Sequence, residues 1–326
     1  MRKVTKMSLI GLLSFSLMMV SISVSSQTMK DAVEAFNKGA ELAKTDPDGA
    51  IVAYESCIDI TSKLGEEGAE TKADAEGQLP VMYFKTAVNS YKKKDFDAAI
   101  TGFEKSKEVA EKYSNEGISS KSDKVIPQVY YAQGSSFYKK KDFENAIAAM
   151  DKAIELNPKY AKPYLVLASI YKSENDEEKF TETCDKGIEV GTTIHDKKTV
   201  ASINKLAKNT MFNNAVKAIE AEKWPDAEKY LNSSIKYGNE SADVFYQLAK
   251  VYNAQKKWDD AIINLDKAVG IDTNDEAGKA KYYYEYGVAY SGKGDATSAC
   301  SSFKKAQHGQ YADNAKYQIE QVLKCK

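Results

Sequence analysis

The sequence predicts an all-α protein, a helical solenoid of about seven helix–turn–helix units that ends in a capping helix. In residues 127–160, apolar or small side chains recur every three or four positions along two successive segments, as one buried face per helix requires. A second observation is self-similarity, because residues 92–100 (KKKDFDAAI) are nearly repeated as residues 139–147 (KKKDFENAI). Copies of one hairpin bury their apolar faces by stacking, so we expect one continuous array.

Residues 127–160 are the clearest copy of the unit. Small residues at Gly134, Ala146 and Ala153 allow two helices to approach to about 8–10 Å, and Asp142 is placed to cap the second helix. This 34-residue pattern, with its ordered aromatic, small and alanine positions and its final proline, resembles the tetratricopeptide repeat. The resemblance extends over nearly all of residues 27–326, and it implies a right-handed helical solenoid of TPR-like units.

The other units follow the same pattern with different regularity. Phe180 stands where the family has alanine, which leaves the helix crossing of the fourth unit open. A stripe of Ala315, Ile319 and Leu323 predicts that residues 311–324 form a capping helix over the end of the solenoid. The expected units span approximately 31–60, 80–113, 127–160, 161–191, 208–238, 241–272 and 279–309.

Three segments between units carry loop or extension signals. Residues 61–77 are interpreted as extensions of the flanking helices, with a loop near residues 65–68. Residues 114–123 hold Asn-Glu-Gly and Ser-Ser signals, and residues 191–197 follow a glycine, so both are predicted to be loops. Residues 200–221 are expected to form one longer helix.

Residues 1–26 differ in composition from the rest of the chain. Basic residues at positions 2, 3 and 6 precede the apolar run 7–20, and small serines follow, which indicates a secretory signal peptide cleaved near Ser25 or Ser26. The alternative is a membrane anchor, but the run is shorter than the roughly 20 apolar residues of a spanning helix. We therefore expect an exported protein of the periplasm or cell envelope, with no integral membrane segment after cleavage.

The charged residues do not indicate a nucleic-acid surface. Of 46 basic and 47 acidic residues, cleavage removes three basic ones, which leaves 43 against 47 and a net charge of −4. Lysines and glutamates are interspersed without long runs of one sign, as on ordinary solvated helices.

Known catalytic and cofactor motifs are missing from the sequence. It contains no P-loop, no Gly-x-Gly-x-x-Gly and no His-Glu-x-x-His run, and its two histidines are far apart along the chain. Paired carboxylates are common, as expected by default on helices rich in Asp and Glu. We therefore expect no enzyme activity, no cofactor and no metal site.

Four cysteines in an exported chain raise the question of disulfides. Cys57 and Cys184 occupy core positions and are interpreted as buried small residues. Antiparallel packing of the capping helix on the last unit would bring Cys325 near Cys300. A bridge between these two cysteines and a pair of free thiols both remain open.

The inner groove is the candidate binding surface, because in this family it is lined largely by the first helix of each unit. The alternative is that the groove aromatics only pack between adjacent first helices. The positions at which some tetratricopeptide domains clamp a C-terminal carboxylate hold Val88, Ser135, Ser169 and Val216, so that clamp is not expected. The candidate partner-binding residues are Phe84, Tyr91, Lys92, Tyr131, Tyr138, Lys139, Tyr246 and Tyr284.

We expect a non-enzymatic scaffold or adaptor that binds a protein or peptide partner in this groove. Exposed rings beside ammonium groups favour an extended peptide. The alternative is a module that binds glycan or peptidoglycan fragments, because aromatic rings also stack on sugar rings.

Overall fold

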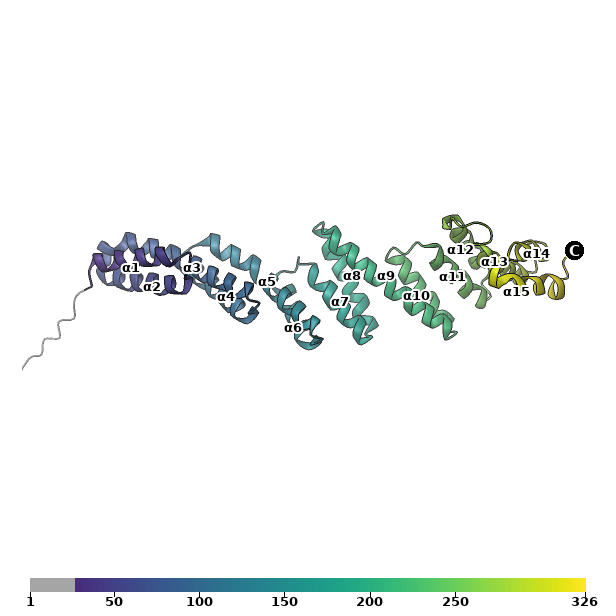
Figure 1. The fold of residues 1–326 in the computed structure, drawn as a ribbon, viewed down its shortest axis with the longest axis horizontal. Helices are drawn as coiled ribbons and strands as arrows, with labels where there is room; N and C mark the ends of the chain where they lie inside the picture. The colour runs from purple at the N-terminus through teal and green to yellow at the C-terminus, as the bar shows by residue number, and fades with distance from the viewer. Residues whose placement is uncertain (1–26) are drawn as a thin grey trace, which may run out of the picture. The chain divides into compact units, whose positions relative to one another are not determined.

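The computed structural model describes residues 27–326, so the predicted signal peptide at residues 1–26 lies outside the described residues. Within this range the regular structure is helical, with no strand, and consecutive helices pair as hairpins (Figure 1). The prediction of an all-α fold of helix hairpins is confirmed. The described chain divides into two compact units, residues 27–86 with 105–119, and residues 87–104 with 120–326.

The first compact unit begins with a helix hairpin in which the N-terminus of each helix is capped. Thr28 accepts a hydrogen bond from the backbone N–H of Asp31, and the Asp31 carboxylate accepts one from the N–H of Thr28, a capping box. Asp46 caps the second helix by accepting from Gly49. The ring of Tyr54 packs against Phe36 with centroids 5.6 Å apart. The helices are α1 (Met29–Leu42), α2 (Pro47–Leu64) and the 3₁₀ turn η1 (Gly65–Gly68), followed by part of α3 (Ala69–Lys92) and part of α4 (Phe96–Lys112).

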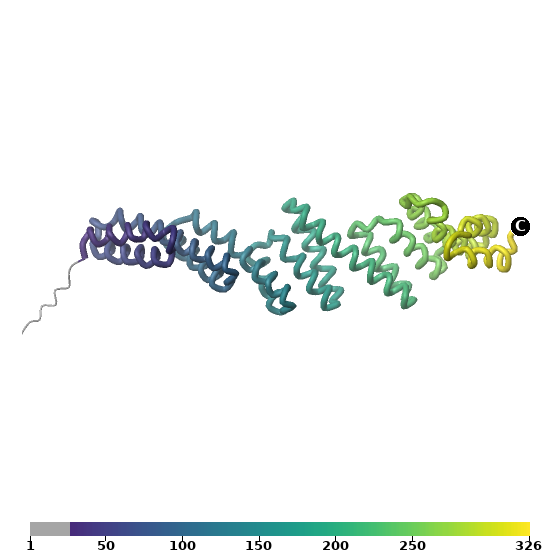
Figure 2. The backbone as a smooth tube through the Cα atoms, in the orientation of Figure 1, coloured from purple at the N-terminus to yellow at the C-terminus, as the bar shows by residue number. Residues whose placement is uncertain are grey.

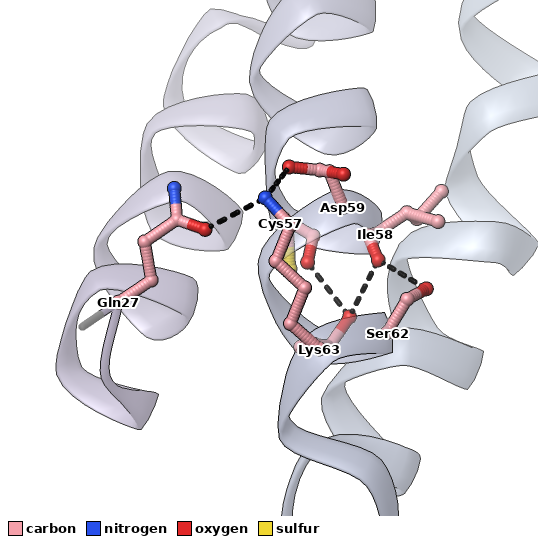
Figure 3. A network of polar contacts seen from close by, with 7 residues as sticks. Gln27, Cys57, Ile58, Asp59, Ser62 and Lys63 are labelled. Atoms are coloured by element: carbon pink, nitrogen blue, oxygen red, sulfur yellow. Dashed lines mark hydrogen bonds and ion pairs between the residues drawn. The ribbon is translucent and has the colours of Figure 1, made fainter. Parts of the chain in front are cut away.

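The end of α2 is held by polar contacts before the chain turns (Figure 3). The Lys63 ammonium lies 2.6 Å from the Asp59 carboxylate and donates to the side-chain oxygen of Gln27 at 3.1 Å. The buried Thr61 hydroxyl donates to the carbonyl of Cys57 at 2.7 Å, so it is satisfied within its own helix. Residues 65–68 then form the expected break as one 3₁₀ turn.

The second compact unit is a stack of helix hairpins, and each helix in it runs back along the previous one (Figure 2). The first helices α7, α9, α11 and α13 each contact the next in the series, as in a solenoid. The helices are α5 (Glu116–Lys139), α6 (Phe143–Leu156), α7 (Lys162–Glu174), α8 (Glu177–Thr193), α9 (Lys197–Glu220), α10 (Trp224–Lys236), α11 (Ala242–Ala254), α12 (Trp258–Ile271), α13 (Ala280–Lys293), α14 (Ala296–Lys305), η2 (Gly309–Tyr311), α15 (Ala312–Tyr317) and η3 (Gln318–Val322).

Close helix crossings depend on the small residues that the sequence pattern singles out. At Gly134 an added Cβ would lie 2.9 Å from the Met150 side chain and 3.1 Å from the Ala146 carbonyl oxygen. Phe180, the departure from the family pattern, is buried in the core with Cys184 and Ile203. The fourth unit therefore accommodates the larger ring inside its core.

The turns inside the hairpins repeat one local conformation. The residue before the second helix's cap has a positive φ, as at Lys141 (62°), Asn175 (58°) and Gly294 (80°). An aspartate then caps that helix, as predicted for Asp142, which accepts from the N–H of Asn145 at 3.3 Å. In α10 and α12 the cap residue is lysine, at positions 223 and 257, and no side chain caps the helix.

Two predicted segments differ from the structure. The loop expected at residues 114–123 is wrong, because α5 begins at Glu116 and runs through Pro127. Asn115 explains the difference: its side-chain oxygen accepts from the N–H of Ile118 at 3.2 Å, so the Asn-Glu-Gly signal marks a helix start. The loop expected at residues 191–197 is shorter than predicted, because α8 continues to Thr193 and α9 begins at Lys197. The helix extension expected before residue 80 is confirmed, since α3 begins at Ala69 and contains Pro80 in its interior.

Candidate functional site

Three tyrosines of the second compact unit form what we call the tyrosine cluster. They are Tyr91, Tyr131 and Tyr160. The rings of Tyr131 and Tyr160 meet edge to face with centroids 5.5 Å apart. Burial, with smaller contributions from the phenols of Tyr131 and Tyr91, raises the pKa of Tyr160 to about 12. Tyr91 is 40% exposed. Tyr160, in the loop after α6, was not among the predicted site residues, because only the fold brings it onto Tyr131.

The other predicted residues of this region stay near the surface. The Tyr138 ring stacks on Phe143 with centroids 6.1 Å apart, and Tyr91 meets the equivalent Phe96 at 6.0 Å. Lys92 and Lys139 are exposed beside these pairs. Phe84 is half-buried and lies in the part of α3 that belongs to the first unit.

The last two predicted tyrosines are covered by the C-terminal segment. Tyr246 is 7% exposed, and its hydroxyl oxygen lies 3.1 Å from that of Tyr311, just before α15. Its ring also packs on Tyr282, with centroids 5.6 Å apart. Tyr284 contacts the rings of Phe303 and Tyr311, with centroids 5.4 and 5.5 Å apart. These two positions follow the alternative reading, in which groove aromatics pack between elements of the protein.

The cysteines separate into two classes. The structure joins Cys300 on α14 to Cys325 after η3, with Cα atoms 5.8 Å apart, within the span that a disulfide allows. Cys57 and Cys184 are free and buried. Burial raises the pKa of Cys184 to about 12, so its thiol is protonated and unreactive at neutral pH.

A cavity of about 440 Å³ opens between the turn ends of two successive hairpins, α7–α8 and α9–α10. We call it the α7–α10 cavity. Its apolar lining includes Tyr171 and Phe180, and the rest is mostly polar. The polar lining residues are Lys172, Asn175, Asp176, Glu177, Thr210, Asn213, Asn214, Lys217, Lys223, Asp226 and Tyr230.

Two of its three carboxylates are already engaged. Asp176 caps α8 and lies 3.2 Å from the Lys179 ammonium, and the backbone N–H of Lys179 is the main cause that lowers its pKa. Glu177 accepts from Lys229 at 2.7 Å and from the Tyr230 hydroxyl at 2.5 Å. Burial acts to raise the pKa of Glu177, but these hydrogen bonds outweigh it and lower the pKa. Both groups are therefore ionised at neutral pH.

A second cavity, of about 380 Å³, lies in the first unit and differs in its polar groups. The Tyr83 hydroxyl donates to Glu55 at 2.8 Å, and Lys105 pairs with Glu108 at 2.8 Å. The Tyr83 hydroxyl and the charges of Lys105 and Glu108 therefore already have partners within the protein. Among residues 27–326, no cluster of metal-ligating side chains is found, and none of their helices is long and apolar enough to cross a membrane.

Comparison with known proteins bears on the repeats. No curated protein sequence matches the chain. Similar solved structures include MamA (22% identity, covering 61% of this chain and 96% of that one, TM-score 0.30). Another is YrrB, a TPR protein with an unusual peptide-binding site (18% identity, covering 62% of this chain and 96% of that one, TM-score 0.35). A third is a tetratricopeptide repeat protein from Parabacteroides merdae (11% identity, covering 89% of this chain and 98% of that one, TM-score 0.31). Scores this low carry no inference about function.

Sequence models of the tetratricopeptide repeat match three segments of the chain. One model matches residues 127–160 and 280–307, and a second matches residues 212–276. These segments cover α6 and α10 to α14, together with the adjacent ends of α5 and α9, all within the second compact unit. The chain therefore carries tetratricopeptide repeats in these three segments.

Proposed function

We propose that this protein is a non-enzymatic scaffold that binds an extended segment of a partner protein on the first helices of its repeats. The observation that carries the proposal is the tyrosine cluster, in which Tyr91 and Tyr131 remain partly exposed next to Tyr160. Rings that are half-buried and rigid offer a large contact area at a low entropic cost.

The charges around the cluster favour a peptide over an apolar ligand. Lys92 and Lys139 are exposed and form no ion pair with another of the described residues 27–326. Ammonium groups beside aromatic rings suit a segment that combines apolar and acidic side chains. Because Tyr246 and Tyr284 are covered by Tyr311, we assign partner binding to residues 87–104 and 120–160 of the second compact unit.

We also propose that the scaffold works in the cell envelope. The support is the composition of residues 1–26, with a basic start, an apolar run and small residues before Gln27. Fractionation of cells that express the full chain, with mass spectrometry of its N-terminus, tests this. A protein found in the cytosol with residues 1–26 intact would contradict the proposal.

The binding experiment is a pull-down from crosslinked envelope fractions. The wild-type protein is compared with the Tyr131→Ala, Tyr138→Ala variant. A matched control is Tyr317→Ala, which removes a tyrosine that is 59% exposed on the C-terminal segment. Circular dichroism melting of each protein shows whether the variants remain folded.

We expect a specific protein that the wild type and Tyr317→Ala retain and the double variant loses. If the wild type and both variants retain the same protein, Tyr131 and Tyr138 are not part of the binding site. If no protein is retained by any form, the scaffold proposal fails, and titration with soluble saccharides then tests the glycan-binding alternative.

A further inference from the structure

The α7–α10 cavity contains more polar groups than the protein itself satisfies. Lys172, Lys217 and Lys223 line it, and none of their ammonium groups has a hydrogen bond or ion pair with a described residue. The side-chain amides of Asn213 and Asn214 are likewise without a hydrogen-bond partner among residues 27–326. Asparagine amides and lysine ammonium groups together supply several hydrogen-bond donors to one space.

The charge of the cavity is positive once internal pairs are removed. Asp176 is matched by Lys179, and Glu177 is matched by Lys229. Asp226 is the one lining carboxylate for which no partner is found among the residues that the structure describes. Three unmatched lysines against one unmatched aspartate leave an excess of two positive charges.

A helix N-terminus adds to this excess. α10 begins at Trp224, and its cap residue Lys223 makes no side-chain hydrogen bond to the first turn. The unused N–H groups of an uncapped helix carry a partial positive charge, and in the first turn of α10 these are the N–H groups of Trp224 and Asp226, because Pro225 has none. Lys223 and Asp226 both line the cavity, so this N-terminus lies at its edge.

We propose that the α7–α10 cavity binds a carboxylate-bearing ligand through Lys172, Lys217 and the amides of Asn213 and Asn214. A carboxylate accepts several hydrogen bonds and forms charge-assisted ones with ammonium groups. The Tyr171 and Phe180 surfaces provide contact for the methylene groups of an acidic side chain.

The site differs in place from both surfaces discussed above. It lies at the turn ends between hairpins, and its lining includes none of residues 88, 135, 169 and 216 and no member of the tyrosine cluster. The carboxylate could belong to an acidic peptide or to a free organic acid. This inference does not depend on the proposed scaffold function, because purified protein and defined probes test it directly.

The test is isothermal titration calorimetry of the purified protein with three probes. They are an acetylated tetraglutamate amide, the matching tetraglutamine amide, and succinate. We expect saturable binding of tetraglutamate that weakens with added salt, and no binding of tetraglutamine. Comparable binding of succinate would identify a free acid as the ligand class, whereas binding of the peptide alone would identify an acidic partner segment.

Three variants locate the binding to the cavity. Lys172→Met with Lys217→Met should weaken binding about tenfold or more, because charge-assisted hydrogen bonds are lost. Lys205→Met is the matched control, an exposed lysine on the same helix α9 that does not line the cavity, and it should bind as the wild type does. Asp226→Asn should tighten binding several-fold, since it removes the unmatched carboxylate.

Several results would overturn the proposal. Equal binding of tetraglutamate and tetraglutamine, unchanged binding in the Lys172→Met, Lys217→Met variant, or an equal loss in Lys205→Met each exclude a carboxylate site here. Absence of any binding at low salt does so as well. The fluorescence emission of Trp224 gives a second readout of binding. The chain has two tryptophans, so this emission is recorded in a Trp258→Phe variant, in which only Trp224 remains.

Discussion

The hydroxyl oxygens of Tyr246 and Tyr311 lie 3.1 Å apart, which joins the first helix of one hairpin to the segment that follows the last hairpin. Tyr311 also packs on Tyr284, so one side chain contacts the first helices of two successive hairpins. The C-terminal segment therefore covers the inner side of these hairpins as well as the end of the stack. Under the proposed function, partner binding on first helices would therefore involve the earlier repeats.

Removing the Tyr311 hydroxyl should destabilise this end of the protein. In Tyr311→Phe the buried hydroxyl of Tyr246 loses its partner, at a cost of about 1–3 kcal/mol in the free energy of unfolding. Tyr246→Phe with Tyr311→Phe should cost less than the sum of the two single changes, because neither hydroxyl is then left unpaired. Urea denaturation of the four proteins measures the difference. Strictly additive effects would show that the two hydroxyls do not interact.

Gly287 should not tolerate a methyl group. An added Cβ would lie 2.6 Å from the ring of Phe303, which is fully buried, so Gly287→Ala should lower the free energy of unfolding by about 1–3 kcal/mol. Gly270, inside α12, is the matched control, because an added Cβ there meets nothing within 4 Å. Gly270→Ala should stabilise the protein by roughly 0.5–1 kcal/mol. Stabilisation by both substitutions would contradict the close crossing of α13 and α14.

The bridge between Cys300 and Cys325 should stabilise the C-terminal segment. The two residues are 25 positions apart, and closing a loop of that length contributes about 3.5 kcal/mol in the chain-entropy relation. A reductant should therefore lower the melting temperature of the wild type and leave a Cys300→Ser, Cys325→Ser variant unchanged. A peptide map of the protein isolated without reductant gives the pairing itself. Finding both thiols free would show that Cys300 and Cys325 do not form a disulfide.

Glu285 should make stability depend on pH. Burial raises the pKa of its carboxyl, although a hydrogen bond from Asn253 at 2.8 Å and the charge of Lys250 act in the opposite direction. The phenols of Tyr246 and Tyr284 are the other titratable groups that it influences. The folded protein therefore binds this proton more tightly than the unfolded chain, whose glutamates titrate near about 4.3.

The sign of the effect follows from this shift. The stabilisation is complete below the unfolded pKa and is lost as the pH rises through the folded pKa of Glu285. Glu285→Gln should consequently gain stability relative to the wild type as the pH rises from about 4.3, the unfolded pKa, through the folded pKa of Glu285. Denaturation in urea across this range measures the difference, with the exposed Glu104→Gln as control. A constant difference between wild type and Glu285→Gln would exclude the shift.

The hairpins were predictable because their signals are local. Spacings of three and four define the buried face of each helix, and small residues such as Gly134 mark where two helices cross. The cap at Asp142 was also predictable from one residue type before an apolar run. The loop expected at residues 114–123 failed, because Asn115 serves equally well in a turn and at a helix start.

The candidate sites depend on contacts between hairpins, which local spacing does not encode. Tyr131 and Tyr246 hold equivalent positions in their repeats, yet Tyr131 stays partly exposed while Tyr311 covers Tyr246. The α7–α10 cavity likewise gathers Lys172 and Lys217 from two hairpins. By itself the sequence determined the helices, their pairing and their small crossing residues, because each follows from neighbours within one repeat. Only the tertiary structure decided which rings and charges stay open to a ligand, because that depends on how successive repeats and the C-terminal segment pack.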